Sequence, residues 1–281
     1  MERLWTPWRM RYISGDAREP GCIFCNRLLE DDDTEALILH RGTHTFVIMN
    51  LFPYNTGHVM VVPHQHASDP AELDLAALCE LGQMLPLLTR ALRRVFDCDG
   101  FNVGLNIGSV AGAGVADHLH QHVVPRWEGD ANFMPILAST MAIPELIPST
   151  YAKIRAELHR ELTGAMICEA VILLDNDARI LTRDGGLPQI TIAPEEPVWG
   201  AVVRALPDAV QDVEIAGWAG QARADLPPRP PLALTLRGSC VGAIPEPWTM
   251  SAIDSATLTP DDQATVARAR AQLAPAIART R

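Results

Sequence analysis

The sequence contains a single lysine, Lys153, and its 34 acidic residues outnumber the 23 basic ones, so the formal net charge is −11. Such an acidic chain is not expected to bind nucleic acid or an anionic membrane, because both recruit proteins through positive charge. The N-terminal stretch lacks the apolar core of a signal peptide, and apolar runs such as AVILL are too short to span a membrane. We therefore expect a cytoplasmic protein without nucleic-acid or membrane partners.

Disulfide bonds are not expected either, although the chain has six cysteines. Cytoplasmic proteins rarely keep disulfides, so a disulfide framework is excluded as the basis of the fold. Cys22 and Cys25 form a C-x-x-C pair, which in this compartment indicates a metal site or redox chemistry. The redox interpretation is the weaker one, because no thioredoxin-like βαβ pattern surrounds the pair.

The composition, with 48% hydrophobic residues, is that of a globular protein with enough apolar material for a sizeable core. The apolar patterns predict strands and one long helix, which we expect to be kinked or restarted near Pro86. The predicted strands are residues 35–41, 44–50, 58–63, 100–108 and 118–125, and the long helix is 70–97. This order predicts an α+β domain with an antiparallel sheet.

A second, smaller α+β domain is expected after the stretch TGAM at residues 163–166. We place the domain boundary between 1–163 and 164–281, with a helix at 144–163 closing the first domain. The start of the second domain is weakly similar to the opening of a Nudix domain. The glutamates that would bind magnesium on the following helix are missing, so we name no site residues there.

Three histidines alternate in the stretch ADHLHQHVVPRW, at His118, His120 and His122. In a β-strand, residues at alternate positions point to one face, so the imidazoles form a row with a spacing of about 6.5–7 Å. Such a row can bind a metal, or one imidazole can act as a nucleophile while its neighbours stabilise charge. The alternative is a chance cluster of histidines on a solvated strand face.

The stretch HLHQHVV resembles the motif of the histidine-triad (HIT) family of nucleotide hydrolases and transferases. Further similarity to this family lies in MNLFPYNTGHVMVVP (49–63), NIGSVAGAG (106–114) and CIFC (22–25). RLWTPWRMRYI (3–13) and PRWEGDANF (125–133) resemble a narrower branch, the diadenosine tetraphosphate phosphorylases. The resemblance covers residues 1–163 and implies a HIT-like antiparallel sheet of five strands.

The resemblance also assigns catalytic roles. It implies that His120 is the nucleophile, which forms a nucleotidyl-histidine intermediate at the α-phosphorus. His122 would hydrogen-bond the phosphate or the leaving oxygen, and His58 would support the triad that begins at His118. The substrate contacts implied in the same way are Asn50 for the ribose, Asn106, Ala113 and Gly114 for the phosphates, Phe46, Ile48 and Leu51 for the base, and Trp127 beside the site. Core packing explains the three apolar residues almost as well, and His58 and Trp127 also have purely structural interpretations.

Metal-binding relatives imply a structural zinc site, with Cys22, Cys25, His66 and His118 as ligands. His64 is the competing third ligand. Four protein ligands leave no open position on a tetrahedral zinc, so the site is expected to be structural and not catalytic. No organic cofactor is expected.

The predicted function is cleavage of a dinucleoside polyphosphate, such as diadenosine tetraphosphate, by water or by inorganic phosphate. A nucleoside phosphoramidase, an adenylyl or uridylyl transferase, and a non-catalytic nucleotide sensor remain as alternatives. By analogy with the superfamily, we also expect a homodimer.

Overall fold

The computed structural model describes residues 20–51, 53–111, 114–130, 147–220 and 232–273. Contacts divide these residues into two compact units, and the division falls between residues 146 and 147. The helix α5 (Ile147–Thr163) therefore belongs to the second unit. We expected the boundary after residue 163, at the end of this helix, whereas the contacts place the division before the helix.

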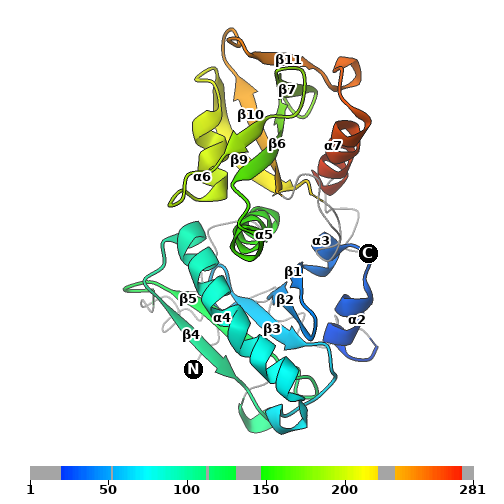
Figure 1. Ribbon diagram of the computed structural model, residues 1–281, viewed down its shortest axis with the longest axis vertical. Coiled ribbons are helices and arrows are strands. Elements are labelled where there is room, and N and C mark those ends of the chain that lie inside the picture. The colour runs from blue at the N-terminus through cyan, green and yellow to red at the C-terminus, as the bar shows by residue number, and fades with distance from the viewer. Residues whose placement is uncertain (1–19, 52, 112–113, 131–146, 221–231, 274–281) are drawn as a thin grey trace, which may run out of the picture. The chain divides into compact units, whose positions relative to one another are not determined.

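The first unit is built on a five-stranded sheet in the order β1-β2-β3-β5-β4 (Figure 1). Each strand is antiparallel to its neighbours. The elements are α2 (Ile23–Leu29), α3 (Asp33–Ala36), β1 (Ile38–Arg41), β2 (Thr45–Met49), β3 (Val59–Pro63), η1 (Pro70–Glu72), α4 (Leu75–Phe96), β4 (Gly100–Leu105), η2 (Ser109–Ala111) and β5 (Gln121–Arg126). The five-stranded antiparallel sheet with helices confirms the fold class predicted for this part of the chain.

The helix α4 lies across one face of this sheet (Figure 1) and contacts β2, β3 and β5. It begins after Asp74, whose side chain accepts a hydrogen bond from the Ala77 amide at 2.7 Å. It continues without interruption through Pro86, so the predicted restart at this proline was wrong. The buried residues are spaced to lie on one side of the helix: Ala77, Leu81, Met84, Leu88, Ala91, Leu92 and Val95.

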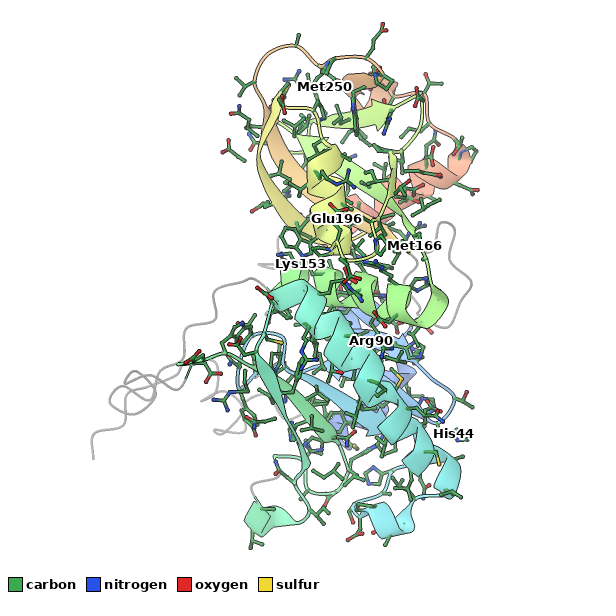
Figure 2. The ribbon with its side chains drawn as sticks, turned by 60° about the vertical axis from the view of Figure 1, so that its left-hand side comes forward. His44, Arg90, Lys153, Met166, Glu196 and Met250 are labelled. Carbon is green, nitrogen blue, oxygen red and sulfur yellow. The ribbon has the colours of Figure 1, made fainter. Side chains whose placement is uncertain are left out.

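By length and composition, α4 is the one helix in the described part of the chain that could span a membrane. The core helix of a globular domain meets the same criterion. Because α4 buries one side against the sheet, we interpret it as such a core helix. Glu80 on α4 also accepts hydrogen bonds from the backbone amides of His44, in the turn between β1 and β2, and of Thr45, the first residue of β2 (His44 is labelled in Figure 2).

The turn between β2 and β3 brings the chain back just before His58. Gly57 in this turn has a φ of +76°, a left-handed conformation that favours glycine. A Cβ atom at this position would lie 2.4 Å from the Phe96 ring at the end of α4. Glycine therefore satisfies two requirements here, the backbone conformation and the close approach of the ring, and both fix the path of the chain into β3.

The second unit is a mixed sheet with helices on both sides. Its strand order is β11-β7-β6-β10-β9, with β8 also paired to β6, and β6 and β10 run parallel. The elements are α5, β6 (Ile167–Leu174), β7 (Arg179–Arg183), β8 (Gln189–Thr191), α6 (Val198–Ala205), β9 (Val210–Trp218), β10 (Ala233–Cys240), β11 (Trp248–Ala252), η4 (Ile253–Ser255) and α7 (Pro260–Leu273). This confirms the second α+β region that we expected.

The strands β6 and β7 form an antiparallel hairpin at the start of the second unit's sheet. Its turn contains Asp175, Asn176 and Asp177, all with positive φ, which is the backbone that short polar side chains tolerate best. Figure 1 shows α6 and α7 on opposite sides of the sheet. On the α6 side, the side chain of Glu196 (labelled in Figure 2) pairs with Arg204 at 2.7 Å.

Glu169 is a buried carboxyl group on β6. Only 3% of its surface is exposed, and its Oε1 atom has no hydrogen-bond partner. Burial raises the pKa of Glu169 from its ordinary value of 4.5 to about 7; the negative charge of Asp262 adds to the rise, and Arg268 opposes it. The folded protein therefore favours the neutral, protonated form of this side chain.

This burial predicts a pH-dependent stability that Glu169→Gln removes. The folded form binds the proton more tightly than the unfolded form, so stability falls as the pH rises from about 4.5 to about 7. We expect Glu169→Gln to raise the thermal midpoint of this unit at pH 8 and to change it little at pH 4.5. Thermal unfolding at both pH values measures the effect, with Glu214→Gln, at an exposed position on β9, as the control. An equal shift at both pH values would contradict the assignment.

Candidate active site

The three histidines of the predicted row lie at the start of β5, which runs between β3 and β4 in the first unit's sheet. His118, His120 and His122 are all buried, with 1%, 5% and 8% of their surfaces exposed. The rings of His120 and His122 meet edge to face, with centroids 4.8 Å apart. The row is therefore an interior cluster of polar rings, and each ring nitrogen needs a hydrogen-bond partner or a ligand.

The regular strand starts later than we predicted. β5 begins at Gln121, so His118 and His120 precede it and only His122 lies in the strand. β5 pairs with its two neighbours only as far as Gln121, which lies opposite Val61 of β3 and Leu105 of β4. The first two rings nevertheless lie on one side, because Phe24 of α2 contacts both, at centroid distances of 5.4 Å to His118 and 5.0 Å to His120.

A chain of hydrogen bonds fixes the proton positions on His58 and His122. The backbone amide of Tyr54 donates to Nδ1 of His58 at 3.0 Å, so this nitrogen carries no proton in the neutral ring. The proton is then on Nε2, which donates to Nδ1 of His122 at 2.9 Å. In its neutral form, His122 therefore carries its own proton on Nε2.

His120 has the opposite arrangement. Its Nδ1 lies 2.9 Å from the backbone carbonyl of His118, which can only accept, so the proton of the neutral ring is on Nδ1. The Nε2 atom of His120 then carries a free lone pair. A lone pair on one imidazole beside a proton on the next provides a nucleophile and a proton donor in adjacent positions.

The rings are held neutral near pH 7. Burial, and then repulsion by the other rings of the row, lower the pKa of His58 to about 3 and that of His122 to about 4. Burial also lowers the pKa of His118 and that of His120. A cationic imidazole has no lone pair, so this shift keeps His120 in its nucleophilic form.

Two of the predicted substrate-binding residues lie against these rings. The Nδ2 atom of Asn50 is 3.3 Å from Nδ1 of His58, and the Nδ2 atom of Asn106 is 3.3 Å from Nε2 of His122. If the side-chain amide of Asn106 is rotated by 180°, its Oδ1 atom takes the place of Nδ2 and accepts the Nε2 proton of His122 in a hydrogen bond. Gly114 is exposed in the loop before the row, whereas Ala113 lies outside the described residues.

The predicted base-contacting residues are divided between the core and the surface. Phe46 and Ile48 are 0% and 5% exposed and pack in one hydrophobic cluster with Phe24. Their side chains are core residues, as in the packing interpretation. Leu51 is 49% exposed. Trp127 donates from Nε1 to the Phe96 carbonyl at 3.3 Å, at the end of α4.

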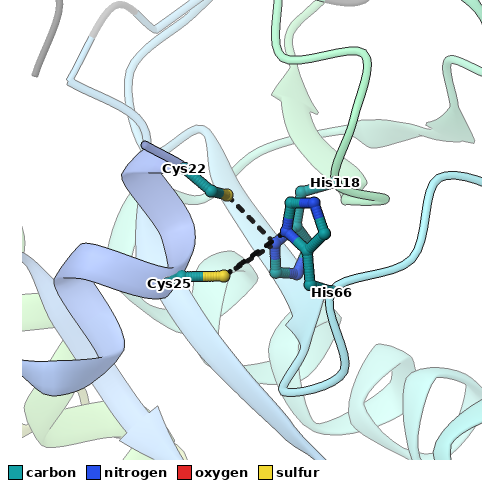
Figure 3. Close-up of side chains that lie close together, drawn as sticks. All are labelled: Cys22, Cys25, His66 and His118. Atoms are coloured by element: carbon teal, nitrogen blue, oxygen red, sulfur yellow. Dashed lines mark hydrogen bonds between the residues drawn. The ribbon is translucent and has the colours of Figure 1, made fainter. Parts of the chain in front are cut away.

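The four predicted metal ligands come together in one cluster (Figure 3). Cys22 and Cys25 are at the start of α2, and their Sγ atoms lie 3.2 Å and 3.6 Å from Nδ1 of His118. Nδ1 of His66 lies 3.4 Å from Sγ of Cys25. His64, the competing candidate, is not part of this cluster.

The geometry of this cluster fits a tetrahedral ion. All four ligand atoms lie within 4.8 Å of one another, and ligands around zinc are roughly 3.3–3.8 Å apart given its bond lengths to sulfur and nitrogen. Nε2 of His118 lies 2.9 Å from the Pro63 carbonyl, which leaves its Nδ1 lone pair directed at the thiols. Burial, and then the neighbouring Cys22, raise the pKa of Cys25, and a bound cation would reverse this effect. The cluster can therefore bind a metal ion.

Comparisons with known proteins identify the family of this chain. The HIT domain model matches residues 32–129. An AP-4-A phosphorylase of Mycobacterium tuberculosis is 38% identical over 169 residues, covering 57% of this chain and 86% of the relative. The chain belongs to the histidine-triad (HIT) family. The family predicted from the stretch HLHQHVV is thereby confirmed.

Other HIT relatives are more distant from this protein. An uncharacterized HIT-like protein of Methanocaldococcus jannaschii is 32% identical over 109 residues, covering 39% of this chain and 81% of its own. A crystal structure of a zinc-bound histidine triad family protein from Mycobacterium smegmatis is 23% identical, with a TM-score of 0.43, and the match covers 52% of this chain and 98% of that one. Both matches leave a large part of this HIT protein uncovered.

Two residues of the site were not singled out in the sequence. Tyr54 lies in the turn before β3, and its ring stacks over His58 at 4.8 Å and His122 at 5.6 Å. Phe24 lies between the two cysteines and contacts the nucleophile candidate. The position of Tyr54 four residues before His58 could have indicated the contact of its amide, because a turn brings such positions together. The contact of Phe24 with His120 depends on tertiary packing.

The hydrogen-bond order predicts an NMR signature. At pH 7, nitrogen spectra should show His58 and His122 neutral and protonated on Nε2, with His122 taking up a second proton only near pH 4. His58→Gln should remove the fixed tautomer of His122. His44→Gln, in the turn between β1 and β2, serves as the control. A His122 ring that is cationic at pH 7, or protonated on Nδ1 alone, would show that this order is incorrect.

Proposed function

We propose that this HIT protein cleaves dinucleoside polyphosphates, with diadenosine tetraphosphate as the substrate, through a nucleotidyl-histidine intermediate on His120. The observation that supports this most directly is the opposite protonation of two adjacent rings, a lone pair on Nε2 of His120 and a proton on Nε2 of His122. The AP-4-A phosphorylase relative supports the choice of substrate.

In the first step, Nε2 of His120 attacks the α-phosphorus and forms a P–N bond. The P–O bond to the rest of the substrate breaks and its electron pair leaves with the oxygen, so that ATP departs as an anion whose developing charge accepts a hydrogen bond from the Nε2 proton of His122. Asn106 donates from its side-chain amide to the phosphate. The step leaves an adenylyl group on Nε2 of His120, while His58 and His122 stay neutral, each with its proton on Nε2.

In the second step, an acceptor oxygen attacks the adenylyl phosphorus and the P–N bond breaks. The electron pair of the P–N bond returns to Nε2 of His120, and the acceptor's proton is released to solvent. Inorganic phosphate as the acceptor gives ADP, whereas water gives AMP. We propose phosphate, because the M. tuberculosis relative is named a phosphorylase; hydrolysis is the alternative within the same mechanism.

The test is to incubate the protein with diadenosine tetraphosphate, with and without phosphate, and to separate the products. Formation of ADP and ATP that requires phosphate supports phosphorolysis, and AMP and ATP without phosphate support hydrolysis. His120→Ala should reduce turnover by at least about a thousandfold, since removal of a nucleophile costs this much in related covalent mechanisms. Nucleotide binding should remain.

The control for this test is His159→Ala, a histidine of α5 in the second unit, which should keep full activity. Acid-labile label from the substrate should appear on His120 after rapid quenching. Turnover that survives His120→Ala would exclude the mechanism. Nucleotide binding without any turnover would favour a sensor, and turnover of a phosphoramidate alone would favour a phosphoramidase.

We also propose that the cluster of Cys22, Cys25, His66 and His118 binds a structural zinc ion. When bound, zinc would act as a cross-link between α2 and the segment that carries the nucleophile. His118 is held by the Pro63 carbonyl on one nitrogen and would ligate through the other. No position is left for substrate, so the chemistry of the two steps remains with the imidazoles.

Metal analysis of the purified protein tests this site. We expect about one zinc per chain, and its loss together with a lower thermal midpoint in Cys22→Ser, because the stability that metal binding contributes is lost. Cys79→Ser, at an exposed cysteine of α4, is the matched control and should keep the metal. A Cys22→Ser protein with an unchanged metal content would rule out this ligand set.

The second unit is proposed to be Nudix-like without the catalytic glutamates. The parallel pairing of β6 and β10 within a mixed sheet supports this, and α6 contains no glutamate. The nearby Glu196 is already bound by Arg204. Nucleotide binding, assembly or covering of the active site are its possible roles. A homodimer, a cytoplasmic location and the absence of nucleic-acid and membrane partners stay predictions.

A further inference from the structure

The stretch PRWEGDANF (125–133) has no part in the two proposed chemical steps, but its described residues, 125–130, contact the turn between β2 and β3. Asp130 ends this part, and its side chain is 13% exposed. Its Oδ2 atom accepts hydrogen bonds from Nε of Arg126 at 2.6 Å, from the backbone amide of Trp127 at 3.1 Å and from Nδ2 of Asn55 at 3.0 Å. The first two donors belong to the same stretch, whereas Asn55 lies in the turn that precedes His58.

Asn55 is the centre of this turn. Its Nδ2 atom also donates to the Pro125 carbonyl at 3.2 Å, so the NH2 group has two acceptors at or just after the end of β5. Its Oδ1 atom accepts from the backbone amide of Thr56 at 3.1 Å, and its carbonyl accepts from the amide of His58 at 3.1 Å. Because both ends of the side-chain amide are bonded, the turn is fixed to the end of β5.

The acceptor that Asn55 uses is itself firmly held. The hydrogen bond from Arg126 lowers the pKa of Asp130 to about 2, so this carboxylate is ionised at neutral pH. Arg126 also donates from Nη1 to Oδ1 of Asn102 at 2.6 Å. Arg126 is on β5 and Asn102 is on β4, so the carboxylate is attached to two strands of the sheet.

The path of the turn determines which donor reaches His58. The backbone amide of Tyr54, the residue before Asn55, donates to Nδ1 of His58 at 3.0 Å. The side chain of Asn50 also approaches this nitrogen, at 3.3 Å, but a side-chain amide can present its oxygen as well as its nitrogen and does not fix a tautomer. Without the Tyr54 amide, His58 can carry its proton on Nδ1 and accept from Nδ1 of His122. His122 then has no proton on Nε2 for the leaving oxygen.

We propose that Asp130 is a positioning residue that keeps the proton of His122 on Nε2. It acts through Asn55, which holds the backbone amide of Tyr54 within reach of His58. Asp130 therefore affects the histidines through three successive hydrogen bonds. This inference rests on the proposed function for its effect on catalysis, whereas its effect on the tautomer of His122 can be measured without turnover.

An exchange of the two polar side chains tests this role. Asn55→Asp replaces the donor Nδ2 with a carboxylate oxygen that repels Asp130, and it keeps an oxygen for the Thr56 amide. We expect nitrogen spectra at pH 7 to show His122 protonated partly on Nδ1. We also expect kcat for diadenosine tetraphosphate to fall roughly a hundredfold with little change in KM, the effect of a displacement of about 1 Å near the reacting groups.

The double variant Asn55→Asp/Asp130→Asn restores a donor and an acceptor in exchanged positions. It should return the proton of His122 to Nε2 and recover roughly tenfold in kcat, because the two side chains act as one pair. Asn176→Asp, at an exposed asparagine in the turn between β6 and β7, is the matched control. It should change neither the spectra nor kcat.

The spectra separate a failure of this inference from a failure of the proposed function. Circular dichroism checks that each variant is folded, and if Asn55→Asp is not, Asp130→Asn tests the same bond from its other end and should shift the tautomer in the same direction. A His122 proton that stays on Nε2 alone in the folded single variants, or that the double variant does not restore, would overturn the proposal. A wild-type protein without turnover would contradict the proposed function only, since the tautomer still decides the role of Asp130.

Discussion

The active-site geometry depends on one hydrogen bond, from the backbone amide of Tyr54 to Nδ1 of His58. A backbone amide has one hydrogen that it can only donate, and it does not change with pH. This fixed donor sets the tautomer of His58, and His58 sets the tautomer of His122 through a second bond. The proton that faces the substrate is therefore determined by the path of the chain in a turn, four residues before the ring that it controls.

This order requires that the rings are neutral, which makes burial as important as hydrogen bonding. Burial lowers the pKa of His58 to about 3 and that of His122 to about 4, so neither ring takes up a second proton near neutral pH. A buried imidazole without partners would be costly. Here the partners are backbone groups and neighbouring rings, and the Nε2 atoms of His120 and His122 remain to act on a substrate. Gly57, packed against Phe96, keeps the turn in the required path.

Much of this site could be predicted from the sequence, for physical reasons that differ between residues. Alternation at His118, His120 and His122 is a local pattern, and it indicated a row although the regular strand begins only at Gln121. The C-x-x-C pair is equally local, and His66, which was preferred over His64 as a ligand, lies in the cluster. Contacts that depend on packing, such as that of Phe24 with His120, cannot be predicted from a local sequence pattern. The division of the chain before α5 is not marked either, because a helix pattern does not indicate which unit the helix packs against.

His118 connects the cluster of Cys22, Cys25 and His66 with His120 through three separate groups. Its Nδ1 faces the thiols of Cys22 and Cys25, its Nε2 is held by the Pro63 carbonyl, and its own carbonyl accepts from Nδ1 of His120. Any shift of the His118 backbone would therefore move the acceptor that keeps the lone pair of His120 on Nε2. A ligand bound by this cluster would restrain that backbone through Nδ1 of His118. This explains how a structural metal ion, which does not touch the reacting phosphate, could still support the reaction.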